Sequence, residues 1–242
     1  MAAPTWVQNP TTGADANATS TTLAFVSNVT AGNSIFVGIR IGATGRTITV
    51  SDTLGNTYGG SPGTTGDVTQ AQTTDGHQTY LFSAHNIAGG ANTVTVAISG
   101  AATTIRFNIG EASFGGTASL DQTASAEGNG TDPSSGATAT TTINDELVVG
   151  VGSNSAGTAW TAGGTYTERG NAPVADTGRT AMETLIVSTT GAQTATWTIT
   201  GTKTWSALVG TYGVAGAAAG HPAMRRWGGV PYMMITSPGW VN

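Results

Sequence analysis

The chain of 242 residues contains no cysteine and a single lysine, Lys203. Without cysteine there is neither a disulfide framework nor a thiolate metal site, so the redox compartment cannot be inferred. Charged residues make up 9% of the chain, against about 25% in an ordinary soluble domain. Neutral Thr, Ser, Asn and Gln side chains must therefore form the polar surface. This composition suits β-structure outside a cytoplasm or inside a symmetric assembly.

Other absences exclude further classes of protein. The net charge of −5 leaves no basic stripe that could displace counterions from phosphate, so we expect no nucleic-acid partner. No apolar run approaches the roughly 20 residues that cross a bilayer, and we expect no membrane association. Residues 1–9 lack both a basic start and an apolar stretch, so they do not predict a signal peptide.

What the sequence does contain is a period-2 pattern that occurs twice. In residues 92–99 every second residue is apolar, as in a strand with one buried face, and the alternation resumes in residues 105–109 after a short turn. The same two strands and turn return about a hundred positions later, in residues 193–200 and 205–209. We interpret this as an internal duplication, with a hairpin as its most recognisable part.

The duplication extends towards the N-terminus. Residues 34–38 match residues 146–150, and residues 5–8 lie about as far ahead of the first segment as residues 119–122 lie ahead of the second. The run at 34–41 is almost continuously apolar, which predicts a strand that is covered on both faces. A threonine-rich strand is also expected at 137–143.

Side-chain bulk is exchanged between the two copies. Small Val96 and large Phe107 in the first copy correspond to large Trp197 and small Ala207 in the second. Cores conserve total volume more strictly than individual residues. We therefore predict that Val96 contacts Phe107 and that Trp197 contacts Ala207.

These patterns predict an all-β protein without a helical domain. We expect two tandem antiparallel β-sandwiches of immunoglobulin-like or jelly-roll topology, at residues 1–116 and 117–215. The 36 glycines fit a chain with many turns. Residues 216–242 are predicted to form a linker and an extended C-terminal arm.

The C-terminal arm differs in composition from the rest of the chain. Three prolines interrupt any helix or central strand, so the arm cannot form a core of its own. Methionine, arginine and aromatic residues are enriched at protein interfaces. We predict that the arm binds a partner, with packing against its own domain as the alternative. The predicted partner-binding residues are Met224, Arg225, Arg226, Trp227, Tyr232, Met233, Met234 and Trp240.

The titratable residues offer few candidates for chemistry. His77, His85 and His221 are isolated in sequence, and none has a second ligand at metal-binding spacing. A glycoside hydrolase needs two facing carboxylates, and Glu111 and Asp121 near the domain boundary are the candidates. For Glu111 we favour a half-buried side chain that is paired with an arginine.

Calcium is the one metal ion that the sequence leaves open. Asp52 with Asn56, or Asp132 with Asp121, could chelate it, but neither pair has the alternating oxygen spacing of a known calcium loop. Neither a Gly-x-Ser-x-Gly motif nor a phosphate-binding glycine loop is present. We therefore predict no cofactor, no metal site and no catalytic residue.

Three segments carry a resemblance to a known group of proteins: Val-Ser-Asp-Thr-Leu-Gly-Asn-Thr-Tyr at 50–58, Ala-His-Asn-Ile-Ala-Gly-Gly-Ala-Asn-Thr-Val at 84–94 and Leu-Asp-Gln-Thr-Ala-Ser at 120–125. They resemble β-sandwich proteins of tailed-phage virions and of secreted bacterial surfaces. The resemblance implies a structural role and carries no functional residue across.

We therefore expect a non-enzymatic virion structural protein, foremost one that decorates or cements a capsid. The C-terminal arm and many weak lattice contacts would hold it in place. Its expected partners are a capsid or other virion protein and further copies of the chain in a homo-oligomer. The expected location is the virion surface, after assembly in a host cytoplasm.

The alternative is a carbohydrate-binding or adhesive surface module, including one associated with a tail or fibre, with a glycan as its ligand. The tryptophans distinguish the two hypotheses, because exposed aromatic rings would have to stack on sugars. Trp160 exposed beside Tyr166 would favour the glycan. If Trp6, Trp160, Trp197 and Trp205 were all buried, the protein would have no aromatic platform for a sugar.

Overall fold

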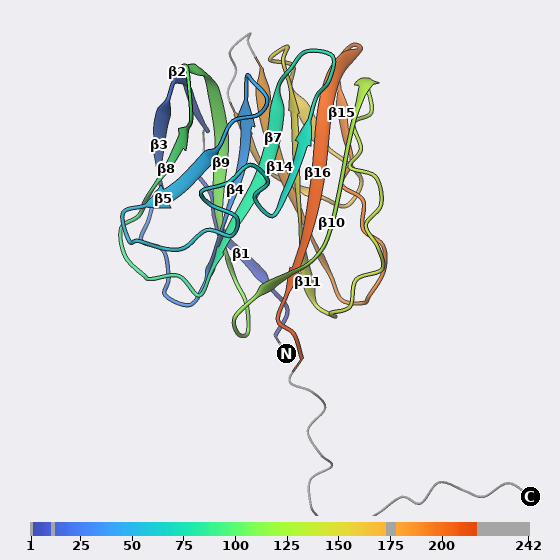
Figure 1. The fold of residues 1–242 in the computed structure, drawn as a ribbon. Coiled ribbons are helices and arrows are strands. Elements are labelled where there is room, and N and C mark those ends of the chain that lie inside the picture. Colours follow the sequence, from blue (N-terminus) through green and yellow to red (C-terminus); the bar gives the residue numbers. More distant parts are fainter. Residues whose placement is uncertain (1, 11–12, 173–177, 217–242) are drawn as a thin grey trace, which may run out of the picture.

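The computed structural model describes residues 2–10, 13–172 and 178–216. All sixteen regular elements in these ranges are β-strands, and every strand pairs antiparallel (Figure 1), so the all-β prediction is confirmed. No helix in this part of the chain is long and apolar enough to span a bilayer. The strands form two groups that follow each other in sequence, β1–β9 and β10–β16.

The first group contains a large and a small sheet. The large sheet has the order β1-β9-β4-β7-β6, and β2 also pairs with β9. Its strands are β1 (Thr5–Gln8), β2 (Ala14–Ala18), β4 (Ser34–Ile41), β6 (Val68–Ala71), β7 (Gln78–His85) and β9 (Thr103–Ser113). The small sheet has the order β3-β8-β5, with β3 (Ser20–Ala24), β5 (Ile48–Asp52) and β8 (Thr93–Ile98).

The second group repeats this arrangement. Its large sheet has the order β10-β16-β11-β14-β13, so β10 takes the place of β1, β16 of β9, β11 of β4, β14 of β7 and β13 of β6. The strands are β10 (Ser119–Gly130), β11 (Glu146–Asn154), β13 (Thr167–Ala172), β14 (Arg179–Val187) and β16 (Lys203–Gly213). A two-stranded sheet pairs β12 (Trp160–Ala162) with β15 (Trp197–Ile199).

Three buried clusters lie between four sheet layers. One fills the space between the small and the large sheet of the first group, and its counterpart does so in the second group. The third lies between the two large sheets and draws residues from both groups: Phe36, Val68, Leu81, Ala112, Leu147, Val149, Val151, Met182, Leu208 and Tyr212. We call this contact between the large sheets the seam.

The seam explains the continuous apolar run that predicts a strand covered on both faces. Every residue of β4 is buried, and so is every residue of β11. One face of each strand packs against its own small sheet and the other face packs into the seam. The expectation of a doubly covered strand at residues 34–41 is therefore confirmed.

The contacts across the seam are reciprocal. β6 packs against β16, and its counterpart β13 packs against β9. In the same way β7 contacts β16 and β11, while β14 contacts β9 and β4. Because β4 also contacts β11, its own counterpart, the two groups face each other as two subunits do about a two-fold axis.

The predicted hairpins are not hairpins. The strands at 93–98 and 103–113 exist, but β8 pairs with β3 and β5, whereas β9 pairs with β4, β1 and β2. Residues 99–102 carry the chain from the small sheet to the large one. Val96 and Phe107 therefore lie in one buried cluster but in different sheets, and Trp197 and Ala207 are related in the same way.

The predicted match between residues 34–38 and 146–150 is displaced by one residue. Phe36 pairs with Gly110 and faces the seam, and the residue that pairs with Gly210 and faces the seam is Val149. The sequence match instead aligned Phe36 with Val148, which faces the cluster between the small and the large sheet of the second group. Strands buried on both faces lack the alternation that would fix their phase.

No strand forms at residues 137–143, so that expectation is wrong. Three buried hydroxyl residues, Ser135, Thr138 and Thr141, occur at every third position. Their N–H groups donate to the carbonyls of residues 195, 193 and 191, and their hydroxyls accept from the N–H groups of the same three residues. We call this the hydroxyl ladder. Every third residue on one side, from 135 to 141, is bonded to every second residue on the other, from 195 to 191. Two regular strands cannot pair in this way.

Candidate functional site

The predicted partner-binding residues, from Met224 to Trp240, lie outside the described residues. The same holds for His221. Their binding role stays a prediction. The sites that the structure does describe are built from the titratable side chains of residues 2–216.

Glu111 accepts its hydrogen bonds from neutral donors in the described part of the chain. It is fully buried on β9. Its Oε1 accepts from the Thr30 N–H at 2.7 Å and from Asn33 Nδ2 at 2.6 Å, while Oε2 accepts from Gln8 Nε2 at 2.7 Å. The interpretation as a half-buried glutamate paired with an arginine is wrong, because neutral donors from the first group enclose the carboxylate.

Asp121 does not face Glu111 but lies near Glu146. Its carboxylate accepts from the N–H and the hydroxyl of Thr142 at 2.5 and 2.7 Å. Burial, together with the neighbouring Asp121, raises the pKa of Glu146 to about 7. The two carboxyl groups therefore form a close acidic pair, although neither of the two hollows described below is lined by both of them.

The calcium candidate Asp52 is also occupied by protein donors. Its Oδ1 accepts from the N–H groups of Leu54 and Asn56, and its Oδ2 accepts from Asn56 Nδ2, the Tyr58 hydroxyl and Asn92 Nδ2. These bonds hold the pKa of Asp52 below its usual value even though burial acts in the opposite direction. No group of three or more metal-ligating side chains occurs in the described residues.

An Asp–His–Ser arrangement lies at one end of the seam. His77 Nδ1 is 2.5 Å from Asp75 Oδ1, and His77 Nε2 is 2.9 Å from the hydroxyl of Ser206. Asp75 and His77 belong to the loop before β7, while Ser206 lies on β16 of the second group. The order of contacts is that of a nucleophile, a general base and an orienting carboxylate.

Ser206 and His77 are too deeply buried for the nucleophilic catalysis that this geometry would otherwise allow. Ser206 is fully buried and His77 is 1% exposed. The Ser206 hydroxyl also contacts the hydroxyls of Thr79 at 2.5 Å and Ser153 at 3.2 Å. Burial lowers the pKa of His77, which keeps the ring neutral at physiological pH. A substrate has no route to the hydroxyl, so the arrangement joins the two strand groups.

No pattern in the sequence predicts this arrangement. His77 and Ser206 are 129 residues apart, and each sits on a different strand group. Only the short spacing from Asp75 to His77 could have suggested a pair. The prediction of a structural role for His77 stays a prediction, and the contacts of its ring with Asp75, Ser206 and Ser155 agree with it.

A second polar chain lies at the other end of the seam, around His85. His85 Nδ1 is 2.9 Å from the Ser34 hydroxyl, and His85 Nε2 is 3.0 Å from the Ser83 hydroxyl. Ser83 donates to Asp67 Oδ2 at 2.5 Å, and the Tyr212 hydroxyl donates to the same oxygen at 2.7 Å. Since Tyr212 comes from β16, this chain also links the two groups.

Both titratable groups of this chain are shifted towards their neutral forms. Burial raises the pKa of Asp67 to about 6, against the effect of the hydrogen bonds from Ser83 and Tyr212. Burial also lowers the pKa of His85 to about 4. At neutral pH the site therefore contains one negative charge on Asp67 and no positive charge on His85.

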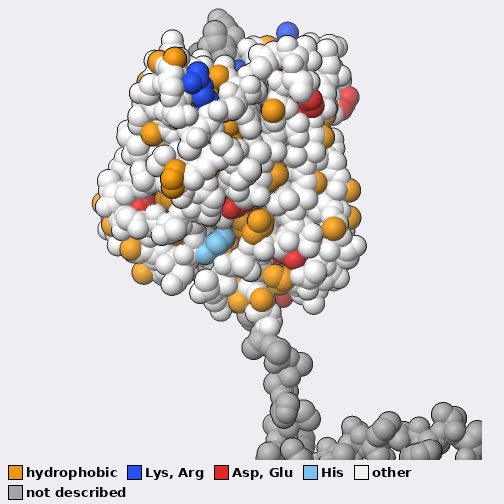
Figure 2. All heavy atoms as spheres, viewed as in Figure 1, with side chains coloured by type: hydrophobic (Ala, Val, Ile, Leu, Met, Phe, Trp, Pro, Cys, Tyr) orange, Lys and Arg blue, Asp and Glu red, His pale blue; other side chains and the backbone are white. Residues whose placement is uncertain are grey.

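Asp67, Ser83 and His85 line a hollow of about 390 Å³. Its remaining lining comes from the loop after β5, with Thr57 and Gly59, and from Ala118 and the start of β10, with Ser119 and Leu120. On this face Figure 2 shows histidine, carboxylate and hydrophobic atoms beside one another. This hollow is the best-developed candidate binding site in the described residues, because it combines open volume with an ordered ionisable group.

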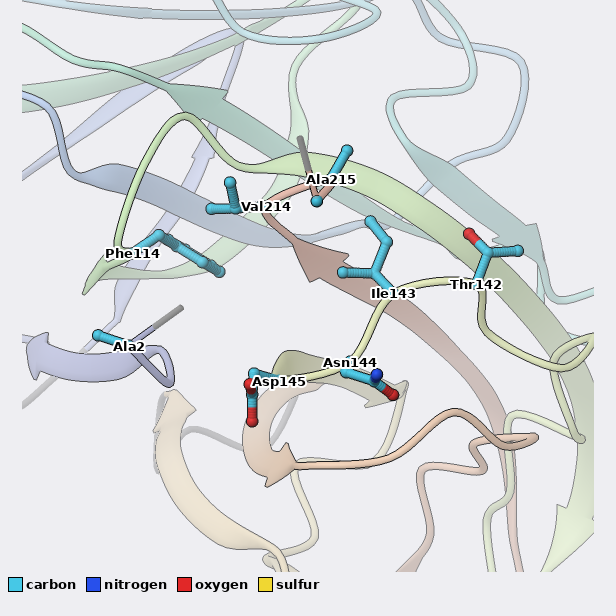
Figure 3. A pocket seen from close by; sticks show the side chains of 9 residues that line it. Ala2, Phe114, Thr142, Ile143, Asn144, Asp145, Val214 and Ala215 are labelled. Carbon is cyan, nitrogen blue, oxygen red and sulfur yellow. The ribbon is translucent and has the colours of Figure 1, made fainter. Parts of the chain in front are cut away.

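A larger hollow of about 530 Å³ lies where the chain leaves β16. Figure 3 shows Phe114 and Ala2 on one side and the loop with Thr142, Asn144 and Asp145 on the other. It lies at the end of the molecule that also holds the N-terminus (Figure 1). Asp145 is its only titratable lining residue, and nothing there forms a catalytic pair.

The tryptophans of the described residues are taken up by packing. Trp160 is 1% exposed and Trp197 is 3% exposed, and the two rings meet edge to face. Trp6 is half-buried between Phe36 and the Arg169 guanidinium, and Trp205 is half-buried against the second group's cluster. The condition for a sugar platform, Trp160 exposed beside Tyr166, is not met.

Searches with the whole chain found no matching protein-family model, no matching curated protein and no matching solved structure.

Proposed function

We propose that the chain is a non-enzymatic structural protein on the surface of a virion, where it decorates or cements a capsid. In finer detail, we propose that the fold consists of two tandem β-sandwiches of immunoglobulin-like or jelly-roll topology that arose by duplication. The repeated sheet order and the reciprocal seam contacts support the duplication. A capsid protein and further copies of the chain are the proposed partners.

The observation that carries a non-enzymatic role is the burial of Ser206. In the described part of the chain, the arrangement with catalytic geometry is enclosed between two large sheets, with its hydroxyl in contact with two further hydroxyls. Glu111 and Asp52 are enclosed by protein donors, and Asp121 and Glu146 line neither hollow. Side chains that could perform chemistry are instead used to hold the sheets together.

The low charge of the chain supports a position in an ordered array. Neutral hydroxyl and amide surfaces can pack against copies of themselves without repulsion between like charges. Weak contacts of this kind become strong when they are repeated over a symmetric lattice. A rigid body with a separate C-terminal segment fits such a role, because the body would form the outer mass and the segment would bind the shell.

The location can be tested on particles from the native source. We expect peptides of this chain in gradient-purified virions, and antibodies against residues 2–216 should label intact capsids in negative-stain micrographs. Tailless capsids serve as a control that separates capsid decoration from a tail or fibre location. Recovery of the chain only from the soluble fraction would contradict the proposal.

The absence of serine chemistry can be tested separately. A fluorophosphonate probe should leave the folded protein unlabelled, because Ser206 is out of reach. Labelling that disappears in Ser206→Ala would show a reactive nucleophile and would contradict the non-enzymatic role. The carbohydrate-binding alternative loses support from the buried tryptophans, and a glycan array with the full chain would test it directly.

A further inference from the structure

The hollow beside β10 contains a carboxylate with one oxygen left open. Asp67 Oδ2 accepts from Ser83 and Tyr212, whereas no hydrogen bond is recorded for Oδ1 among the described residues. Oδ1 lies next to Gly59, which also lines the hollow. The hydrogen-bonded chain of Ser34, His85 and Ser83 holds the Asp67 carboxylate in place through Oδ2. Its Oδ1 is left open towards the hollow.

The walls suit a long side chain with a cationic head. Leu120 is 38% exposed and is one of only four large hydrophobic side chains exposed in the described residues. Aliphatic stems of arginine and lysine pack on such surfaces while their charged heads bind oxygen atoms. No cationic side chain lines the hollow, and Asp67 forms no ion pair within the described ranges.

The chain carries a complementary charge in one segment. All 13 acidic residues lie before position 217, together with 6 of the 8 lysines and arginines, so residues 1–216 have a net charge of 6 − 13 = −7. Residues 217–242 contain Arg225 and Arg226 and no Asp or Glu, which gives a net side-chain charge of +2. The most basic part of the chain is thus the part that follows β16.

The end of β16, which precedes this segment, lies next to the hollow, and residues 214–216 after it line the larger hollow. Ser119 pairs with Gly213 and Leu120 pairs with Tyr212 in the ladder between β10 and β16. Gly216, the last described residue, follows three positions after Gly213. Arg225 is nine residues further, and an extended chain of nine residues spans up to about 30 Å. A tethered group of this length has an effective concentration in the millimolar range.

We propose that the hollow binds an arginine side chain, Arg225 or Arg226, from the C-terminal segment of the same chain. The guanidinium donates to Asp67 Oδ1 and its stem lies against Leu120. Arginine fits better than lysine because its planar fork matches a carboxylate. The inference does not depend on a virion location, since it concerns contacts within one chain.

The absence of cysteine allows a direct test by disulfide trapping. In the double variant Ser119→Cys/Ala223→Cys, the new thiols lie at the rim of the hollow and two residues before Arg225, and both arginines are kept. The matched control is Thr49→Cys/Ala223→Cys, which places the first thiol on an exposed position of β5. Disulfide formation in dilute full-length protein is followed by non-reducing electrophoresis.

We expect a monomeric disulfide that forms faster in the hollow variant than in the control. Adding Asp67→Asn should slow it roughly tenfold, as the loss of one charge-assisted hydrogen bond predicts. Adding Arg225→Gln and Arg226→Gln should slow it equally. This second arm keeps the proposal testable if Asp67→Asn impairs folding, because neither arginine belongs to the described body.

Two outcomes would overturn the proposal. Equal rates with and without Asp67, or with and without the arginines, would show that the carboxylate does not attract the segment. Disulfide-linked dimers in place of monomers would assign the hollow to a second copy of the chain. Failure to find the protein on virions would leave these measurements unaffected, so the two proposals fail independently.

Discussion

Buried carboxylates in this protein are stabilised mainly by neutral donors. Glu111, Asp52 and Glu183 accept from backbone N–H groups, and Glu111 and Asp52 also accept from amide side chains. A chain with few arginines and one lysine has few other means to satisfy them. The cost is that burial is only partly compensated, and the pKa of Glu183 rises to about 8.

The raised pKa of Glu183 makes stability depend on pH. A carboxyl group whose pKa is higher in the folded than in the unfolded protein stabilises the fold fully below the unfolded value of 4.5. That contribution is lost as pH rises through about 8. We expect Glu183→Gln to remove this dependence, which amounts to a few kcal/mol at most.

Urea denaturation at pH 5, 7 and 9 would measure the effect. The difference in unfolding free energy between pH 5 and pH 9 should be smaller in Glu183→Gln than in the parent. Part of the slope will persist in Glu183→Gln, because Asp67 and Glu146 are shifted in the same direction.

Gly38 shows how tightly the seam is packed. A Cβ added to it would lie 2.8 Å from Val151 Cγ2 and 3.0 Å from Met182 Cε. We expect Gly38→Ala to destabilise the protein by about 1–3 kcal/mol through overpacking. Val151→Ala should recover part of this loss in the double variant. Gly191→Ala, whose added Cβ would make only an ordinary contact with Gln193 Nε2 at 3.7 Å, should change the unfolding free energy by less than about 0.5 kcal/mol.

At the level of elements, the hydroxyl ladder replaces a strand. The Thr138 hydroxyl accepts from the Gln193 N–H at 3.0 Å and donates to the Ala139 carbonyl at 2.7 Å. Ser135 makes the same kind of pair of bonds, with the Ala195 N–H and the Gly136 carbonyl. The hydroxyls of Ser135 and Thr138 therefore act as donor and acceptor at once, which a carbonyl cannot do.

We expect Thr138→Val to cost about 1–2 kcal/mol, because it leaves the Gln193 N–H without its acceptor at nearly constant volume. Thr138→Ser should cost less, since the hydroxyl is kept. Thr140→Val at the exposed neighbouring position is the control and should be nearly neutral. Denaturation midpoints of the three variants would show whether the hydroxyl or the methyl group matters; equal losses in all three would refute the ladder.

Sequence reasoning predicted strands better than it predicted their partners. Alternation identified the buried residues of β8 correctly, because burial on one face imposes a period of two. In β9 it found Ile105, Phe107 and Ile109 but missed the residues between them, which are buried as well. It could not reveal that the two strands belong to different sheets, since a buried face looks the same in either case. The threonine-rich stretch failed for a related reason: its buried positions repeat every third residue.

The candidate sites were even less accessible from sequence. Glu111 was singled out from its place near the expected domain boundary, but its donors Thr30 and Asn33 are 81 and 78 residues away. The residues of the His85 hollow come from both strand groups, and their meeting depends on how the large sheets pack. No local pattern encodes that packing.

At the scale of the whole molecule, the seam makes the two strand groups interdependent. The apolar cluster between the large sheets takes residues from both groups, and polar chains cross it at both ends. We therefore expect a single unfolding transition whose calorimetric and van't Hoff enthalpies agree. Two resolved transitions would show that each group is stable without the other.

A substitution in the seam should also destabilise both strand groups. Leu81→Ala removes a fully buried side chain of the first group and should cost about 2–5 kcal/mol. We expect amide hydrogen exchange to accelerate by a similar factor in β8 and in β15, the small sheets that lie beyond the seam on either side. Acceleration confined to β8 would argue for independent halves.

The reciprocal contacts carry a last consequence. A gene that encoded one strand group alone would yield a product complementary to itself, and two such products would meet as equal partners. Joining them in one chain frees the two sides to diverge. Arg40 and Arg106 are cross-strand neighbours in the first group, at the positions that Ser153 and Ser206 occupy in the second group. A homodimer could not maintain this difference, because its two subunits have the same sequence.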